Sequence, residues 1–150
     1  MKHTGVGLSA ALALLSACSA PLEPPPARGW LLSPCASAPN CVSSEAPDDE
    51  HHVDPLPLQG NPATAMARLV EVISAMPRTK IVRANPDYVD AEFTSLIFRD
   101  VDIVQCRVDK NAGVIQIRSA SIEGYYDFGA NRRRVEAIRG ALAAAERSGK

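Results

Sequence analysis

Apolar residues recur at helical spacing in two segments of the second half of the chain. Asn61 and Pro62 suit the N-cap and the first position of a helix that Pro77 would end. Its apolar face consists of Met66, Leu69, Val70, Ile73 and Met76. A second amphipathic helix is predicted over about Asn131 to Arg147, and its apolar face consists of Val135, Ile138, Leu142 and Ala145.

Between these helices, four segments have the character of β-strands. They span residues 80–84, 88–98, 101–108 and 114–119, and the second alternates so that Val89, Ala91, Phe93 and Ile97 share one face. A tight Arg99-Asp100 turn and a loop over 110–113 join neighbouring strands, and such short connections make them antiparallel. The order predicts an α+β fold, in which a four-stranded antiparallel sheet carries two amphipathic helices on one face.

The first residues follow the pattern of a bacterial lipoprotein signal. A positive start, Met1-Lys2-His3, precedes an apolar run over residues 5–15 that is shorter than the roughly 20 residues needed to cross a membrane. Leu15-Ser16-Ala17-Cys18 then resembles a lipobox, in which the cysteine is acylated and becomes the mature N-terminus. We therefore expect residues 1–17 to be a signal peptide and Cys18 to carry the lipid. The alternative is an ordinary signal peptide with a cysteine near its cleavage site by chance.

The lipid defines the expected location and layout of the mature chain. Ser19, not an aspartate, follows the cysteine, a pattern that resembles lipoproteins sent to the outer membrane, where the domain would face the periplasm. Ten of the 12 prolines lie between Pro21 and Pro62, so residues 18–34 are predicted to form an extended tether. Residues 35–150 then form one domain, with an irregular segment over 35–60 and a helix-sheet-helix core over 61–150.

Charge and composition narrow the possible partners. Removing residues 1–17 leaves 15 of the 16 basic residues against 17 acidic ones, so the mature chain has a net charge near −2. A nucleic-acid partner would require a strongly basic face, and we expect none. No cofactor motif is present, and the lipid is the expected contact with the membrane.

Several segments in the predicted domain resemble one family. They are Pro39 to Ser44, His52 to Leu56, Met76 to Arg78, Tyr88 to Glu92, and Arg118 to Ser121 followed by Gly124, Asp127, Gly129 and Asn131 to Glu136. In this order they resemble the domain of unknown function 1499 family, from about Cys35 to the second helix. The resemblance implies an α+β fold and often an envelope or organellar location, but no established reaction. The chain departs from the family at Ile122, where arginine is common, and at Asp100-Val101-Asp102, where two acids are often adjacent.

Cysteines and histidines offer two candidate sites. Cys35 and Cys41 are six residues apart, and in an oxidising compartment they are predicted to form a structural disulfide; the alternative is a redox pair or a reactive Cys41. Cys106 is expected to be a buried, inert thiol. His51 and His52 lie among acidic residues, but adjacent side chains in a loop point apart, so an exposed polar loop is favoured over a metal site.

The most informative region runs from Arg118 to Arg134. Three arginines open the second helix, where the helix dipole favours acids, so something must offset their charge. Either Asp127 and Glu136 pair with them in a structural network, or the region holds an anion such as phosphate or a carboxylate. The candidate ligand-binding residues are Arg118, Ser119, Ser121, Asp127, Asn131, Arg132 and Arg133.

Three functional hypotheses follow. The first is a non-enzymatic binding module of the cell envelope, whose arginine-rich rim accepts a small anionic or amphipathic ligand. The second is an enzyme of unrecognised type that uses Asp127 or Asp102 with Ser119 or Ser121. The third is a structural scaffold without a ligand site, whose protein partner the sequence does not identify.

Overall fold

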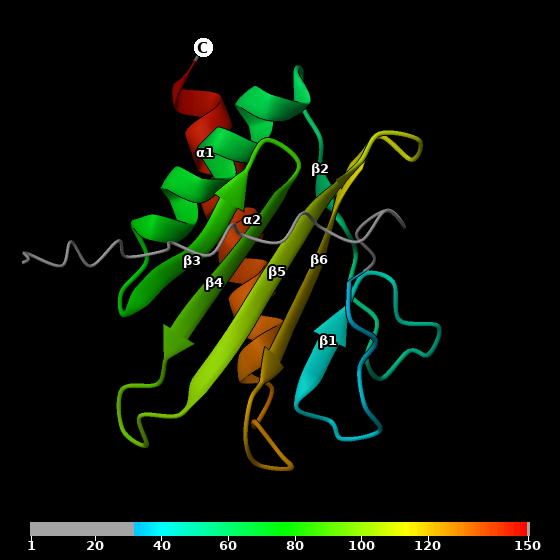
Figure 1. The fold of residues 1–150 in the computed structure, drawn as a ribbon, viewed down its shortest axis with the longest axis vertical. Helices are drawn as coiled ribbons and strands as arrows, with labels where there is room; N and C mark the ends of the chain where they lie inside the picture. The colour runs from blue at the N-terminus through cyan, green and yellow to red at the C-terminus, as the bar shows by residue number, and fades with distance from the viewer. Residues whose placement is uncertain (1–31, 150) are drawn as a thin grey trace, which may run out of the picture.

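The computed structural model describes residues 32–149, so the predicted signal peptide, Cys18 and most of the tether lie outside the described residues. The described chain contains six strands and two helices (Figure 1). In chain order these are β1 (Cys41–Ser43), β2 (Leu56–Pro57), α1 (Pro62–Ser74), β3 (Thr79–Asn85), β4 (Tyr88–Thr94), β5 (Val101–Asp109), β6 (Val114–Ser121) and α2 (Ala130–Ser148).

The strands form one antiparallel sheet in the order β1-β6-β5-β4-β3, and β2 also pairs with β6. Both helices lie behind the sheet in Figure 1, with α1 near β3 and α2 behind the central strands. The predicted α+β class and the antiparallel arrangement are confirmed, but the sheet has six strands instead of four. Strands of three and two residues, such as β1 and β2, are too short to show a period in the sequence. They form because β6 offers a free edge whose backbone groups need partners.

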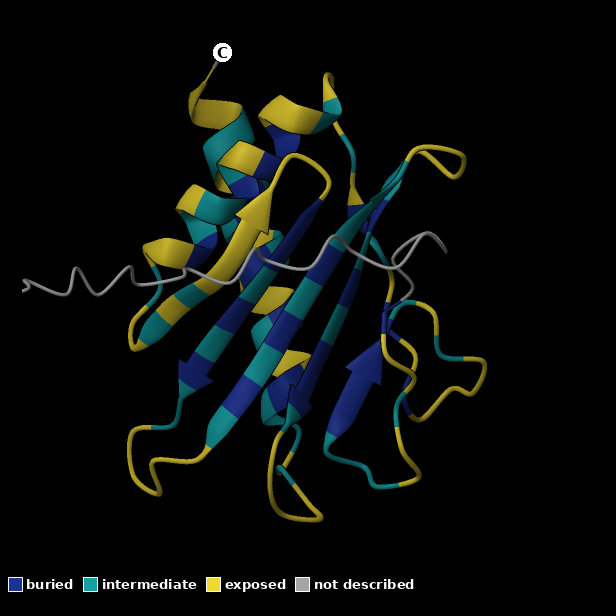
Figure 2. Cartoon of the chain, in the orientation of Figure 1, coloured by how far each residue is buried: buried dark blue, intermediate teal, exposed yellow. Residues whose placement is uncertain are grey.

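The core lies between the sheet and the helices. Inward residues alternate along β4, β5 and β6, and Figure 2 shows this as alternating buried and intermediate bands. The predicted helix faces are confirmed at their central positions, whereas Val70, Met76 and Ala145 are only partly buried. The side chains at the centre of the core are Met66, Leu69 and Ile73 of α1, Val135, Ile138 and Leu142 of α2, and Val89, Val104, Ile115 and Ile117 of the sheet.

Asn61 caps α1 as predicted, because its side-chain oxygen accepts from the backbone amides of Ala63 and Thr64 at 2.9 and 3.4 Å. Pro62 occupies the first turn, where no amide donor is required. The Lys110–Gly113 loop forms the predicted hairpin between β5 and β6, and Gly113 adopts the positive φ of 68° that the reversal requires. These local signals fix the ends of their elements.

The connection between β4 and β5 differs from the prediction. β4 ends at Thr94, and a loop over residues 95–100 replaces the predicted Arg99-Asp100 turn. The loop is closed by hydrogen bonds between Ser95 and Asp100, from Ser95 N to Asp100 O at 2.8 Å and from Asp100 N to Ser95 Oγ at 3.0 Å. Ile97, expected on the buried face, is 79% exposed. The alternation of the sequence therefore continues past the end of the strand into a loop of apolar residues.

The three described cysteines behave as predicted. Cys35 and Cys41 form a disulfide with a Cα–Cα distance of 5.6 Å, which ties the start of the described chain to β1. Closing so short a loop stabilises the fold by about 2 kcal/mol in the chain-entropy model. Cys106 is buried on β5, and burial raises the pKa of its thiol, so it stays protonated. Neither described helix is both long and apolar enough to cross a membrane.

Candidate functional site

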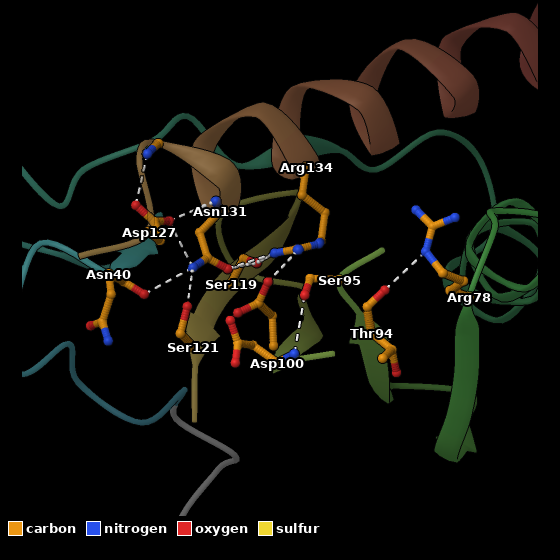
Figure 3. A network of polar contacts seen from close by, with 12 residues as sticks. Asn40, Arg78, Thr94, Ser95, Asp100, Ser119, Ser121, Asp127, Asn131 and Arg134 are labelled. Carbon is orange, nitrogen blue, oxygen red and sulfur yellow. Dashed lines mark hydrogen bonds and ion pairs between the residues drawn. The ribbon is translucent and has the colours of Figure 1, made fainter. Parts of the chain in front are cut away.

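A buried polar network joins β6 to the first turn of α2 (Figure 3). Ser119 and Asn131 are both 0% exposed, and the Ser119 hydroxyl donates to the Asn131 side-chain oxygen at 2.6 Å. The Asn131 amide nitrogen donates to the Asn40 carbonyl at 2.9 Å and to Ser121 Oγ at 3.1 Å. Asn131 therefore links the helix to β6 and to the chain just before β1.

Asp127 performs the N-capping of α2 that Gly129 cannot perform without a side chain. Its carboxylate accepts from the backbone amides of Gly129 and Asn131, both at 2.8 Å, and from the Asn131 side chain at 2.9 Å. A carboxylate at this position also interacts favourably with the positive end of the helix dipole. The expected pairing of Asp127 with the arginines is wrong, because the carboxylate bonds to amides instead. Glu136 pairs with Arg139, at 3.1 Å, and not with the arginine run.

The three arginines at the start of α2 have three different environments. Arg132 donates to the backbone carbonyls of Glu50 and His52, both at 2.7 Å, and so fastens the helix to the loop before β2. Arg134 forms an ion pair with Asp102 of β5 and donates to Asn131 Oδ1 at 2.7 Å. Its guanidinium also lies 5.0 Å from the centre of the Phe93 ring. Arg133 is exposed and makes one hydrogen bond, to the backbone carbonyl of Phe128.

The structure separates the predicted site residues into two groups. Ser119, Ser121, Asp127 and Asn131 come together, because positions 119 and 121 lie on the helix-facing side of β6. Arg118 does not join them, because successive residues of a strand point to opposite faces. It lies on the other face of the sheet, where its guanidinium donates to Gln105 at 3.2 Å.

Two members of the network were absent from the predicted ligand-binding residues. Asp102 was considered only as an enzymatic acid, and Arg134 only as part of the arginine run. Arg134 lies three residues after Asn131, a spacing that places both side chains on one helix face and so gave a usable signal. Asp102 gave no such signal in the sequence. It joins the network because β5 pairs with β6 so that Asp102 lies opposite Ser121.

The network does not provide the chemistry of a serine hydrolase or of a carboxylate base. The Ser119 hydroxyl donates its proton to an amide oxygen, which is not a base, and accepts from Arg134 at 3.1 Å. The Asp102 carboxylate is held by Arg134, and that of Asp127 by three amide N–H groups. These groups therefore have structural roles, and the enzymatic hypothesis finds no activated nucleophile among Ser119, Ser121, Asp102 and Asp127.

A groove of about 290 Å³ opens beside the network, between the start of β3, the end of β4 and the start of α2. Its lining consists of Met76, Pro77, Arg78, Phe93, Thr94, Ser95, Ala130, Arg133 and Arg134. Three arginines and no carboxylate line this groove, and Met76, Pro77 and Phe93 give it an apolar wall. Arg78 is held at the groove by a hydrogen bond from its Nε to the Thr94 carbonyl at 3.1 Å.

A larger hollow of about 630 Å³ lies elsewhere, next to the disulfide. Its lining begins at Leu32, the first described residue, and its charged side chains are Glu45 and Asp48. Carboxylates repel an anion, so this hollow does not suit the ligand that the arginine-rich region was expected to accept.

The histidine-containing loop is a structural element. His51 is buried, with Nδ1 2.7 Å from Asp48 Oδ1 and Nε2 3.2 Å from the Ala38 carbonyl, whereas His52 is exposed. The prediction of an exposed loop is thus wrong for His51 and right for His52. In the described part of the chain, no three side chains of histidine, cysteine, aspartate or glutamate form a group suited to a metal ion.

Stability is expected to fall as the pH rises through the titration of His51. The hydrogen bond to Asp48 raises the pKa of His51 above its ordinary 6.5, and burial opposes this effect. Both ring nitrogens face acceptors, and only the imidazolium donates to both. The stability that protonated His51 contributes is therefore complete below the pKa of His51 in the unfolded state. It disappears as the pH rises through the pKa of His51 in the folded state. Thermal denaturation of the wild type and His51→Gln from about pH 6 to pH 8 measures it.

The two melting temperatures should converge as the pH rises across this window. Asp48 acts in the opposite range: its hydrogen bonds with the His51 backbone amide and imidazole lower its pKa below the ordinary 3.8, so its contribution disappears only in acid. The proposed role of His51 is wrong if the two melting temperatures change in parallel between pH 6 and pH 8.

The fold and the network define a small α+β domain in which a buried asparagine fastens a helix to a sheet, with an arginine-lined groove beside it. Residues 31–142 match a family described as "Protein of unknown function (DUF1499)". The chain belongs to this family, and the resemblance seen in the sequence is confirmed. A comparison with curated proteins found no match.

Proposed function

We propose that the protein is a lipid-anchored lipoprotein of the cell envelope whose domain binds an anionic, amphipathic ligand in the arginine-lined groove. The observation that carries the ligand part is the lining itself, which combines three arginines with an apolar wall and contains no carboxylate. The lipobox around Cys18 and the proline-rich segment after it support the anchor. The orientation towards the periplasm from the outer membrane is supported by Ser19.

Among the described residues, an acid balances only one of the three groove arginines. Arg134 is balanced by Asp102, whereas the hydrogen bonds of Arg78 and Arg133 run to the neutral carbonyls of Thr94 and Phe128. The guanidinium groups of Arg78 and Arg133 therefore lie beside an apolar wall with neutral hydrogen-bond partners. Guanidinium groups suit phosphate and carboxylate groups because their N–H donors match two acceptor oxygens at once.

Backbone strain is concentrated at the same end of the molecule. Within residues 32–149, three residues other than glycine have positive φ angles: Arg78 at 57°, Arg99 at 64° and Phe128 at 55°. The left-handed conformation costs a side chain-bearing residue about 1 kcal/mol or more, and such residues gather at functional sites. Arg78 lines the groove, and Phe128 supplies the carbonyl that holds Arg133, so the strain supports a binding role for this region.

The test uses two ligands with the same alkyl chain and opposite charge, dodecyl phosphate and dodecyltrimethylammonium. Below their micelle concentrations, the phosphate should bind and shift the backbone amide resonances of residues around the groove, whereas the cation should not. Arg78→Ala and Arg133→Ala should each weaken phosphate binding about tenfold, the loss expected for a charge-assisted hydrogen bond. Isothermal titration calorimetry measures the affinities.

Arg147→Ala is the matched control, because it removes the same charge from an exposed position near the far end of α2. Its affinity should stay close to that of the wild type. Equal binding of both ligands, or equal weakening in all three variants, would contradict the anion site. No binding of either ligand would favour the scaffold hypothesis instead. Metabolic labelling with a radioactive fatty acid, lost in Cys18→Ala, tests the anchor separately.

A further inference from the structure

Large apolar side chains are exposed at one end of the domain. Eight large hydrophobic residues are exposed in the described part of the chain, and seven of them lie on two loops. The β4–β5 loop carries Leu96, Ile97 and Phe98, and the loop between β6 and α2 carries Ile122, Tyr125, Tyr126 and Phe128. Figure 2 shows both loops as exposed segments at the same end of the sheet. We call these seven side chains the apolar tip.

The two loops form one surface. Ile122 N donates to the Val101 carbonyl at 3.0 Å, and Phe98 and Ile122 line the same hollow of about 340 Å³. Within the second loop, the rings of Tyr126 and Phe128 pack edge to face with their centres 5.0 Å apart. Soluble domains rarely expose so many neighbouring large side chains without a partner for them.

We infer that the apolar tip is a membrane-docking surface, which inserts into the interface of the lipid bilayer that carries the anchor. Four of the seven side chains are aromatic, and tyrosine in particular favours the interface between lipid chains and headgroups. The inference rests on the proposed lipid anchor, because the anchor keeps a bilayer close to the domain. Thirteen residues separate Cys18 from Leu32, and an extended proline-rich chain of that length reaches about 40 Å.

Charged side chains of both signs lie around the apolar tip. Arg99 lies within the β4–β5 loop. Ser95, at the start of the same loop, lines the groove that also contains Arg78 and Arg133. Asp100 and Glu123 also lie at the tip, so apolar contact is expected to carry most of the binding, with the arginines adding a preference for anionic lipid. A docked tip would bring the groove to the level of the headgroup phosphates. The ligand of the groove would then be the phosphate of an anionic phospholipid.

The test places a single tryptophan reporter in the full mature, lipidated chain. Trp30 is the only natural tryptophan, and Trp30→Phe removes it. Phe98→Trp then reports from the apolar tip. Val82→Trp is the control, because Val82 lies on β3 and is, among residues 32–149, the one exposed large hydrophobic residue outside the tip. The chains are reconstituted into phosphatidylcholine vesicles with and without phosphatidylglycerol, with bromine atoms on the lipid chains as quenchers of fluorescence.

The reporter of Phe98→Trp should be quenched roughly twofold or more strongly than that of Val82→Trp, as expected for a side chain at the lipid interface. The difference should increase with phosphatidylglycerol. Adding Ile97→Glu to Phe98→Trp should reduce the quenching to the control level without lowering the melting temperature, because Ile97 is 79% exposed.

Two failures are distinguishable. Flotation with the vesicles together with equal, weak quenching at both positions would show that the anchor works and the docking surface is wrong; the tip would then belong to a protein contact. Failure to float would contradict the anchor and the inference that rests on it.

Discussion

Replacing Asn131 with alanine is expected to lower the free energy of unfolding by about 4 kcal/mol, a large part of the stability of a domain of this size. The Asn131 side chain is fully buried and holds groups from four parts of the chain. Its amide nitrogen donates to Asn40, Ser121 and Asp127, and its oxygen accepts from Ser119 and Arg134. Alanine leaves these groups without their partner in a site that water does not reach, and each buried unsatisfied group costs about 1–3 kcal/mol.

Urea denaturation followed by circular dichroism measures this loss as a lower midpoint with an unchanged slope. Asn111→Ala is the matched control, because Asn111 is an exposed asparagine in the β5–β6 hairpin, and the change there should stay within about 0.5 kcal/mol. Asn131→Asp should also be destabilising, since it places a second carboxylate beside that of Asp127. A stability of Asn131→Ala equal to that of Asn111→Ala would show that the network does not hold the helix to the sheet.

The helices and the inner faces of the central strands were predictable because each is long enough to show its period. Leu69 and Ile73 on α1 and Val89 and Ala91 on β4 lie in the core for this reason. β1 and β2 have no period to show, and they exist only through pairing with β6. At Ile97 the sequence alternates but the structure has no strand. Alternation of apolar and polar residues does not make a strand where no neighbouring strand pairs with it.

The network was predictable only where it is local in sequence. Ser119 and Ser121 share a face because they are two residues apart, and Asp127 caps the helix that begins shortly after it. Alternation within β6 also implied that Arg118 points away from Ser119. The role of Asp102 depends on the register of β5 against β6, which the sequence does not reveal.

The groove and the apolar tip depend on tertiary structure in the same way. Arg78 and Arg133 are 55 positions apart, and they meet because α2 returns to the end of the sheet where β3 begins. Phe98 and Ile122 become neighbours because β5 and β6 pair along their length. Three arginines in a row pointed to this region, and Arg133 among them lines the groove, but the pattern gave no indication of Arg78. Arg132 and Arg134 hold the structure, and Arg133 together with Arg78 carries the free charge.

Asp102→Asn is expected to lower the free energy of unfolding by about 3 kcal/mol and to tighten binding of dodecyl phosphate at the same time. The side chains of Asp102 and Arg134 are 8% and 14% exposed, so the asparagine leaves a nearly buried guanidinium without a counter-charge. Arg134→Met should be similarly destabilising. The double variant Asp102→Asn/Arg134→Met should recover most of the loss, because it removes both buried charges and keeps an apolar side chain over Phe93.

A double-mutant cycle measures the coupling, which should be about 2 kcal/mol. The exposed pair of Lys80 and Glu92, 3.3 Å apart on β3 and β4, is the control, and its coupling should be about 0.5 kcal/mol or less. Arg134 lines the groove, so releasing it from Asp102 adds a third free charge there, and stability and affinity move in opposite directions. If the groove binds an anion as proposed, Asp102 limits the attraction while it holds the helix in place. An Asp102→Asn variant that loses stability and binds the phosphate no better than the wild type would place Arg134 outside the ligand site.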